Sequence, residues 1–406
     1  MKWIEGGVCA PNGFKAGGIH CGIRNGKDKE DLALIYSSEP CVGAGLFTRN
    51  RVKAAPVKLD QKTIRNDSFH AIIANSGIAN ACAPHDYENA VAMQNAAAKA
   101  LGIAPETVLV GSTGVIGKDL DVSKIEAGLP ALIEALKADG SGSDKAAKAI
   151  MTTDTRKKEL AVEVELDGTT VHIGGISKGS GMIHPNMGTM LCYLTTDASI
   201  KKELLQKALK TVCDRSFNRI SVDGDTSTND SLLILANGLA GNPEIKEESE
   251  AFARFTEALE ALCVELARRM AADGEGASHL ITCTVFHCLG EPRAEILAKS
   301  VIRSPLTKAA IFGTDANWGR VLCALGYAGE EFDQDQVTIS FRSSYGEIMV
   351  CQNGKGLEFD EVLAKAILSE DEVEILVDMN EGEESVTCWG CDLTYDYVKI
   401  NGDYRT

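Results

Sequence analysis

Short apolar runs rich in β-branched residues alternate along the whole chain with longer amphipathic runs, and glycine-rich turns separate them. The short runs predict strands and the long runs predict helices, because one face of a strand repeats every second residue and one face of a helix about every 3.6 residues. Such alternation is typical of the mixed α/β class. We therefore expect an α/β (α+β) fold, while the order of the strands stays open.

Individual elements follow from the same pattern. Strands are predicted at 32–36, 71–74, 107–110, 160–166, 170–173, 232–235, 280–286, 337–341 and 346–350. Helices are predicted at 123–138, 200–213, 251–272 and 360–368. Asp86 is expected to cap a further helix that runs to Leu101 and stops at Gly102. The small, polar segment 139–145 predicts a surface loop, and the acidic segment 326–335 is expected to lead into two paired strands.

Charge and length restrict the class of protein. The 406 residues include 41 basic and 58 acidic ones, which gives a net charge of −17. Binding to nucleic acid or to an anionic membrane needs a basic face, so both are disfavoured. The length suggests two or three domains. The amino terminus has no apolar signal core and no uncharged apolar run reaches the ~18 residues of a membrane span, so we expect a cytoplasmic protein.

The thirteen cysteines predict reduced thiols rather than disulfides. Their number is odd, and several, such as Cys192, Cys213 and Cys323, stand in apolar surroundings. Both features are typical of buried thiols in a cytosolic enzyme. Cys388 and Cys391 form a CxxC, which can be redox-active or half of a zinc site. Because no second CxxC is present and no helix start follows, we interpret them as structural thiols.

Segment 174–191 is the most unusual stretch, with closely spaced glycines and a G-x-S-x-G pattern from Gly175 to Gly179. That pattern is a nucleophile elbow when a helix follows the serine. Here further glycines and Pro185 follow Ser177, and both disfavour a helix. We therefore reject an α/β-hydrolase site at this position.

A second glycine-rich stretch, 111–117, has only a superficial likeness to a phosphate-binding loop. Its spacing is wrong by one residue, and Asp119 stands where a metal-binding hydroxyl is required. Two interpretations stay open. The stretch is either a plain turn after a strand or a loop that directs backbone N–H groups and the Thr113 hydroxyl toward an anion.

The dipeptide Gly188-Thr189 has a chemical interpretation beside the ordinary one of a turn. A threonine hydroxyl becomes a useful nucleophile when a base lies beside it, and its own α-amino group is such a base once the preceding peptide bond is cut. That amine titrates near pH ~8 in peptides, so part of it is neutral at physiological pH. Glycine before the threonine permits the distorted backbone that an N-to-O acyl shift needs.

Two further polar features each have two open interpretations, and the histidines suggest no site. Segment 223–230 is an Asx-rich turn or an oxygen-rich metal site. Glu275 follows a predicted helix and is either solvated or bound to a cationic group. The seven histidines include no HExxH and no close ligand set, so we predict no catalytic histidine and no metal.

Taken together, ordered motifs along nearly the whole chain resemble the ornithine acetyltransferase family, that is, the glutamate N-acetyltransferases of arginine biosynthesis. The motifs lie at 11–19, 47–57, 112–117, 178–183, 217–225, 315–320 and 396–406. The resemblance implies layered mixed sheets with flanking helices, built from two fragments after self-cleavage. The cut would fall between Gly188 and Thr189, which gives an alpha fragment of 1–188 and a beta fragment of 189–406.

The resemblance also implies roles for individual residues. Thr189 would be the nucleophile, with Thr113 and Gly114 as the oxyanion hole. The substrate-binding positions would be Thr153, Lys178, Thr189, Glu275, Asn401 and Thr406, and Thr152 stays open as the alternative to its neighbour Thr153.

The reaction implied is a ping-pong acetyl transfer from N2-acetyl-L-ornithine to L-glutamate through acetyl-Thr189, without a metal or redox cofactor. Acetyl-CoA stays open as a second donor, and a heterotetramer of two alpha and two beta fragments is the family's expected assembly. A self-processing amidase or aminopeptidase of similar architecture is the alternative, with water as the acceptor. The chain departs from the family pattern at Gly188, where alanine is usual, and at Ile78, Ala83 and Pro84.

Overall fold

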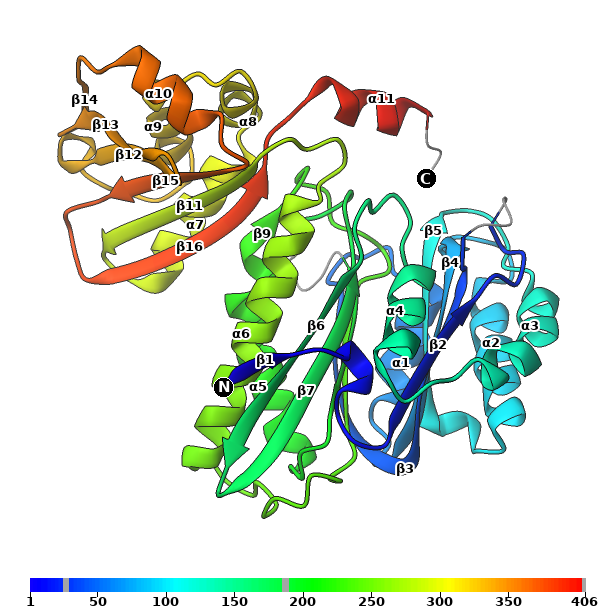
Figure 1. Cartoon of the computed structure of the whole chain (residues 1–406). Coiled ribbons are helices and arrows are strands. Elements are labelled where there is room, and N and C mark those ends of the chain that lie inside the picture. Colours follow the sequence, from blue (N-terminus) through cyan, green and yellow to red (C-terminus); the bar gives the residue numbers. More distant parts are fainter. Residues whose placement is uncertain (25–28, 185–189, 404–406) are drawn as a thin grey trace.

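The computed structural model describes residues 1–24, 29–184 and 190–403. Its described part forms two units, each built on one β-sheet (Figure 1). The larger unit holds a nine-stranded sheet and the smaller unit a seven-stranded one. The mixed α/β class predicted from the sequence is confirmed. Within the described ranges, no helix has both the length and the apolar character needed to cross a membrane.

The nine-stranded sheet bends into two layers at its longest strand. Its order is β1 (Lys2–Ile4), β6 (Lys158–Leu166), β7 (Thr169–Lys178), β8 (Leu191–Thr196), β10 (Ser231–Ala236), β3 (Leu32–Phe47), β4 (Phe69–Ile78) and β5 (Val108–Val115), with β2 (Phe14–Ile19) also paired to β3. The first half of β3 pairs with β4 and its second half with β10, and the register shifts between Tyr36 and Cys41. Side chains of both layers, such as Ile72 and Tyr193, share one buried core.

Helices cover the outer face of each layer (Figure 1). On one side lie α5 (Lys202–Arg215) and α6 (Glu250–Ala272), which form a core with β6 to β8 and β10. On the other side lie α1 (Ala55–Thr63), α2 (Asp86–Leu101) and α3 (Val122–Glu134), which form a core with β4 and β5. The larger unit is therefore a sandwich of helices, sheet, sheet and helices.

Helix α2 agrees closely with the prediction. It ends at Gly102, whose φ of 70° is left-handed and costs glycine little. At the other end the prediction is wrong by one residue, because Asp86 is the first helical residue and His85 occupies the cap position without a side-chain cap. The acidic Asp86 still lies in the first turn, where it interacts favourably with the helix dipole.

Segment 139–145 is helical, which corrects the loop predicted there. Helix α4 spans Gly140–Ala149, and the Asp139 side chain caps it by accepting a hydrogen bond of 2.9 Å from the Ser141 N–H. The small residues that suggested a loop let the helix approach β2, because a Cβ on Gly142 would lie 2.4 Å from the Ala16 carbonyl oxygen. Tertiary packing thus outweighs the low helix propensity of the stretch.

The smaller unit carries its helices against a separate core. Its sheet runs β14 (Lys355–Gly356), β13 (Gly346–Gln352), β12 (Thr338–Ser343), β15 (Glu372–Asp378), β11 (Leu280–Cys288), β16 (Glu384–Cys391) and β9 (Ile220–Ser221). Its helices are α7 (Glu291–Arg303), α8 (Pro305–Phe312), α9 (Trp318–Gly326) and α10 (Glu361–Leu368). Segment 326–335 leads into the antiparallel pair of β12 and β13, as predicted.

Short 3-10 helices and one terminal helix complete the described chain. The 3-10 helices are η1 (Gly7–Cys9), η2 (Pro105–Thr107), η3 (Phe217–Arg219) and η4 (Gln334–Gln336). Helix α11 (Tyr395–Asp403) leaves the smaller unit and reaches over the larger one, in red at the top of Figure 1. It therefore brings the end of the chain toward residues of the larger unit.

The cysteines are free thiols throughout, as predicted, and ten of the thirteen are buried. Cys323 is exposed, which corrects the expectation for that residue: it lies on the outward side of α9, whereas Val321 and Ala324 face the core. Burial raises the pKa of Cys388 to about 12 and also raises that of Cys391. Both thiols therefore stay protonated, which favours a structural role for the CxxC.

Candidate active site

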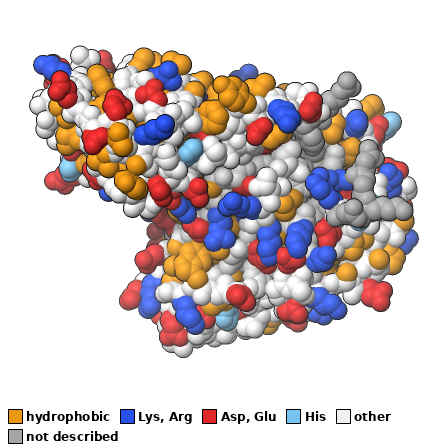
Figure 2. All heavy atoms as spheres, turned by 45° about the horizontal axis from the view of Figure 1, so that its top comes forward, with side chains coloured by type: hydrophobic (Ala, Val, Ile, Leu, Met, Phe, Trp, Pro, Cys, Tyr) orange, Lys and Arg blue, Asp and Glu red, His pale blue; other side chains and the backbone are white. Residues whose placement is uncertain are grey.

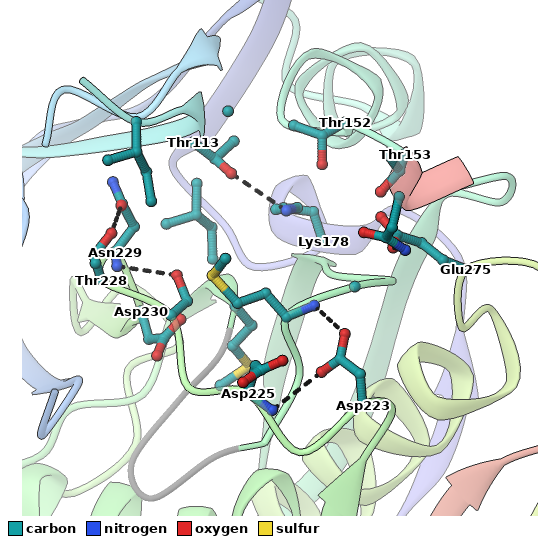
Figure 3. A pocket seen from close by; sticks show the side chains of 18 of the residues that line it. Thr113, Thr152, Thr153, Lys178, Asp223, Asp225, Thr228, Asn229, Asp230 and Glu275 are labelled. Atoms are coloured by element: carbon teal, nitrogen blue, oxygen red, sulfur yellow. Dashed lines mark hydrogen bonds between the residues drawn. The ribbon is translucent and has the colours of Figure 1, made fainter. Parts of the chain in front are cut away.

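One cavity of 240 Å³, here called the central pocket, collects residues from distant parts of the chain. It lies where the carboxyl ends of β5 and β7 meet the beginning of β8. Its lining residues are Thr113, Gly114, Ile116, Thr152, Thr153, Lys178, Gly181, Met182, Met190, Leu191, Asp223, Asp225, Ser227, Thr228, Asn229, Asp230, Glu275, Tyr397 and Asn401 (Figure 3). Every described residue to which the resemblance gives a catalytic or substrate-binding role therefore lines the central pocket.

Thr113 and Gly114 stand near the end of β5, beside β4. Gly114 has a φ of 128°, and a Cβ there would lie 2.3 Å from the carbonyl carbon of Gly77. Only glycine fits this backbone conformation and this close approach to the neighbouring strand. Thr113 is 8% exposed, and its Oγ1 accepts a hydrogen bond of 3.3 Å from Nζ of Lys178. The stretch 111–117 is thus the end of a strand that turns toward the pocket.

Lys178 is the last residue of β7 and pairs with Leu191, the first residue of β8. The antiparallel register therefore places it next to the start of β8. Its side chain points into the pocket toward Thr113 (Figure 3). Burial lowers the pKa of the Lys178 ammonium, while the negative charge of Asp154 opposes that shift. Of the described lining residues, Lys178 is the one base.

Thr152 and Thr153 both line the pocket (Figure 3). Both therefore stay candidates for the substrate-binding threonine. The hydroxyl of Thr153 is hydrogen-bonded to that of Ser180 at 2.7 Å. The Thr152 carbonyl oxygen accepts a hydrogen bond of 3.3 Å from Arg24. Both contacts hold the segment between α4 and β6 against the pocket.

Glu275 and helix α11 form the outer wall of the pocket. Glu275 is 9% exposed, and its Oε2 accepts a hydrogen bond of 2.7 Å from Nδ2 of Asn401. The Tyr397 hydroxyl donates to Oδ2 of Asp223 at 3.3 Å. Two side-chain contacts thus connect α11 to the rest of the pocket, and Glu275 is the predicted residue whose carboxylate could meet a cation.

Three of the predicted positions lie outside the described residues: Gly188, Thr189 and Thr406. The next described residue after the predicted cut is Met190, which is 3% exposed and lines the pocket. Its carbonyl oxygen accepts a hydrogen bond of 2.9 Å from the Ser231 N–H. The described chain therefore resumes at the wall of the pocket.

Segment 223–230 is a part of the site to which the resemblance assigned no substrate-binding residue. Asp223 accepts hydrogen bonds from the N–H groups of Met182 and Ile183, at 2.6 and 2.9 Å, and from that of Asp225 at 3.3 Å. This is the Asx-type turn of the two alternatives. Around it and elsewhere in the described ranges, no three His, Cys, Asp or Glu side chains group as metal ligands.

The end of that segment ties the two sheet layers together. Nδ2 of Asn229 donates to the carbonyl oxygens of Ala79 and Ser112, at 2.6 and 2.8 Å. Burial raises the pKa of Asp230 well above its ordinary value. The motif at 217–225 was the sequence signal for this region, but nothing in it indicated that the following residues would line the pocket.

The rejected hydrolase pattern stays rejected in the structure. Ser177 is buried within β7 and does not line the pocket. The described residues after β7, up to 184, contain no helix. The strand-to-helix turn of a nucleophile elbow is therefore missing from this described stretch.

The charges of the pocket favour a ligand with both signs. One base, Lys178, lines the pocket together with the carboxyl groups of Glu275, Asp223, Asp225 and Asp230. Burial also raises the pKa of Asp223, which weakens its negative charge relative to that of an exposed aspartate. On the face of the molecule drawn in Figure 2, acidic and basic side chains are intermixed. A zwitterionic amino acid with an extra ammonium group matches this arrangement.

Comparison with known proteins gives a consistent result. A family model described as the ArgJ family matches residues 15–406. Arginine biosynthesis bifunctional protein ArgJ 1 of Clostridium acetobutylicum is 52% identical, over 97% of this chain and 96% of its own length. Arginine biosynthesis bifunctional protein ArgJ of Symbiobacterium thermophilum is 50% identical over 100% of both.

A solved structure gives a similar match. The crystal structure of arginine biosynthesis bifunctional protein argJ from Bacillus halodurans is 43% identical, with a TM-score of 0.50. It covers 52% of this chain and 98% of the solved chain. The solved chain is therefore about half as long as this one.

Proposed function

The chain belongs to the ArgJ family, and we propose that it transfers the acetyl group of N2-acetyl-L-ornithine to L-glutamate, giving L-ornithine and N-acetyl-L-glutamate. As a family member it is an acetyltransferase of arginine biosynthesis. The observation that carries the proposal is the central pocket, in which Lys178 and Glu275 offer opposite charges beside Thr113 and Gly114.

Both substrates fit one part of this charge pattern, and acetylornithine also fits the other part. Each carries an α-carboxylate, which the ammonium of Lys178 meets. The extra ammonium of ornithine is met by Glu275, with Asn401 holding that carboxylate in place at 2.7 Å. Hydrogen bonds to charged groups of this kind are each worth about 1.5–3 kcal/mol.

The proposed chemistry begins at Thr189. Its α-amino group takes the hydroxyl proton, and the hydroxyl oxygen attacks the acetyl carbonyl carbon of acetylornithine. The tetrahedral oxyanion accepts hydrogen bonds from the Thr113 hydroxyl and the Gly114 N–H. Because the Lys178 ammonium donates to Oγ1 of Thr113, the hydrogen of that hydroxyl is free to point at the oxyanion.

Collapse of this intermediate expels ornithine, which takes the proton back from the α-amino group. The product is acetyl-Thr189. The amine of glutamate then attacks the ester by the same steps in reverse, which completes a ping-pong transfer. Acetyl-CoA is proposed as a second donor to the same threonine, since the matched relatives are named bifunctional.

Self-cleavage between Gly188 and Thr189 is proposed as the step that frees the α-amino group. It would give fragments 1–188 and 189–406, and the half-length solved chain of the Bacillus halodurans relative is the size expected of one such fragment. Strands β8 and β10 belong to the second fragment but pair with β7 and β3 of the first. That shared sheet would hold the fragments together, and two pairs of fragments would form the proposed heterotetramer.

The test separates the transferase from an amidase. Purified protein receives acetylornithine with and without glutamate, and released ornithine is measured beyond one equivalent per site. The proposal predicts turnover only with glutamate. Continued release of ornithine and free acetate without glutamate would instead identify water as the acceptor.

A further inference from the structure

A buried ion cluster lies behind the wall of the central pocket. Nζ of Lys158, the first residue of β6, is 2.7 Å from Oδ1 of Asp154 and 2.6 Å from Oδ2 of Asp273. The three residues are 1%, 9% and 7% exposed, respectively. Burial of charges is costly unless each one is paired and hydrogen-bonded. Here the two carboxylates share one ammonium, so this buried triad has a net charge of −1.

The two carboxylates also hold the backbone of three segments. Oδ1 of Asp154 accepts a hydrogen bond of 2.7 Å from the Gly179 N–H, and its Oδ2 accepts one of 3.0 Å from the Thr152 N–H. Asp273 accepts from the N–H and the hydroxyl of Thr155. The triad therefore joins the segment before β6, the end of β7 and the end of α6.

Each of these segments carries one predicted substrate-binding residue. Thr153 directly precedes Asp154, Lys178 directly precedes Gly179, and Glu275 stands two residues after Asp273. All three line the central pocket. A displacement of the triad would move all three of them at once.

The charge of the triad matters most for Lys178. Among the described residues, no carboxylate forms an ion pair with Lys178, and its ammonium donates a hydrogen bond to the neutral hydroxyl of Thr113. Burial lowers the pKa of Lys178. The charge of Asp154 opposes this, that of Lys158 adds to it, and Glu275 and Asp230 oppose it from the other sides of the pocket.

We propose that Asp154, Lys158 and Asp273 are positioning residues that fix the three substrate-binding segments and supply the net negative charge that keeps the buried ammonium of Lys178 protonated. The significance for catalysis rests on the proposed function, in which Lys178 binds the substrate carboxylate. The charge balance itself does not depend on that function.

Two substitutions change the net charge of the triad in opposite directions. Lys158→Met removes a positive charge that lowers the pKa of Lys178, which should raise that pKa. Asp273→Asn leaves a neutral triad, which should lower it. If the triad only stabilised the fold, the pKa of Lys178 would not change in either variant, or it would change in the same direction in both.

The experiment measures the ionisation of Lys178 without using the reaction. The protein is labelled with trace acetic anhydride over a pH series, and the labelling rate of Lys178 is mapped by mass spectrometry. We expect the midpoint to move by about one pH unit upward in Lys158→Met and about one unit downward in Asp273→Asn. Lys157→Met is the matched control, because Lys157 is the neighbouring residue, its side chain is 42% exposed, and it pairs with Asp144 and Glu159 rather than with the triad.

Shifts in the same direction in both variants, or in neither, would overturn the proposal. If Lys158→Met does not fold, Asp273→Glu replaces it. Because this variant keeps the negative charge, its labelling midpoint should lie near that of the wild type. A midpoint equal to that of Asp273→Asn would also overturn the proposal. The basic limb of kcat/KM for acetylornithine should move with the labelling midpoint. Opposite labelling shifts without any acetyl transfer would refute the proposed function and leave the charge balance standing.

Discussion

The inner and outer walls of the central pocket are built in opposite ways. The inner wall consists of strand ends, with Thr113 and Lys178 at 8% and 9% exposure, and the buried triad lies behind it. The outer wall includes α11, which has no buried residue and exposes Tyr395 to 84% and Val398 to 69%. Its side chains reach the pocket through Tyr397 and Asn401.

This difference assigns different roles to the two walls. Strand register and buried hydrogen bonds hold the inner wall whether or not a ligand is present, as preorganised catalytic groups require. Helix α11 is held by few side-chain contacts. Changes in its side chains can therefore alter the affinity for substrate without altering the sheet. We therefore expect changes at Thr113 to affect mainly kcat and changes in the outer wall to affect mainly KM. Changes at Lys178 should affect both, because in the proposed function it binds the substrate carboxylate and it also donates to Thr113.

The largest effect is expected from Thr113→Ala. Loss of one oxyanion donor typically lowers the rate by about 10²–10³-fold, and in the proposed mechanism both half-reactions use the same donor. Stopped-flow measurements of ornithine release and of glutamate acetylation check this. Thr113→Ser keeps the hydroxyl and is the matched control. Loss of rate in only one half-reaction would contradict a shared oxyanion hole.

Lys178→Met should raise KM for acetylornithine by about ten- to a hundred-fold, since a charged hydrogen bond worth about 1.5–3 kcal/mol is lost. Lys178 also donates to Thr113, so a smaller fall in kcat accompanies it. In the wild type, burial lowers the pKa of Lys178, so this residue loses its charge at a lower pH than an exposed lysine does. KM should therefore begin to rise at that lower pH. Steady-state kinetics across pH measure both, and a KM independent of pH would contradict the role.

Asn401→Ala tests the outer wall. It removes the 2.7 Å hydrogen bond to Glu275, and we expect KM for acetylornithine to rise by about three- to ten-fold with kcat nearly unchanged. Val398→Ser, on the exposed face of the same helix, is the control and should change neither. A fall in kcat as large as that of Thr113→Ala would abolish the distinction between the walls.

The last prediction concerns the carboxy terminus, where Thr406 lies outside the described residues. If its α-carboxylate faces a substrate ammonium, a carboxy-terminal tag should raise KM while an amino-terminal tag leaves it unchanged. Self-cleavage should continue in both, because it needs no bound substrate. Equal kinetics for the two tagged forms and for a chain without Arg405 and Thr406 would place the chain end outside the site.

The sequence predicted the fold class and the elements with strong periodicity, such as α2 and α6. It missed α4, because Gly142 and Ser143 signal a loop when their packing partners are unknown. Local pattern could not show that β3 bends and divides one sheet into two layers. That long-range pairing is what brings Thr113 to Lys178.

For the site, the resemblance to the family identified six residues that the structure places together in the central pocket. The residues around them gave no such signal. Asp154, Lys158 and Asp273 are common charged residues, and their pairing depends on the approach of α6 to β6. Tyr397 contacts the pocket only because α11 crosses from one unit to the other. Contacts between distant segments have no local pattern and appear only in the folded chain.

The central claim is that Thr189 carries the acetyl group. The most direct measurement is to incubate the purified protein with acetylornithine in the absence of glutamate, separate the fragments, and map acetylation by mass spectrometry. The account predicts a chain cut after Gly188, with one acetyl group on Thr189 that disappears when glutamate is added. An uncut chain in an active preparation, or an acetyl group on a cysteine or on Ser177, would contradict it.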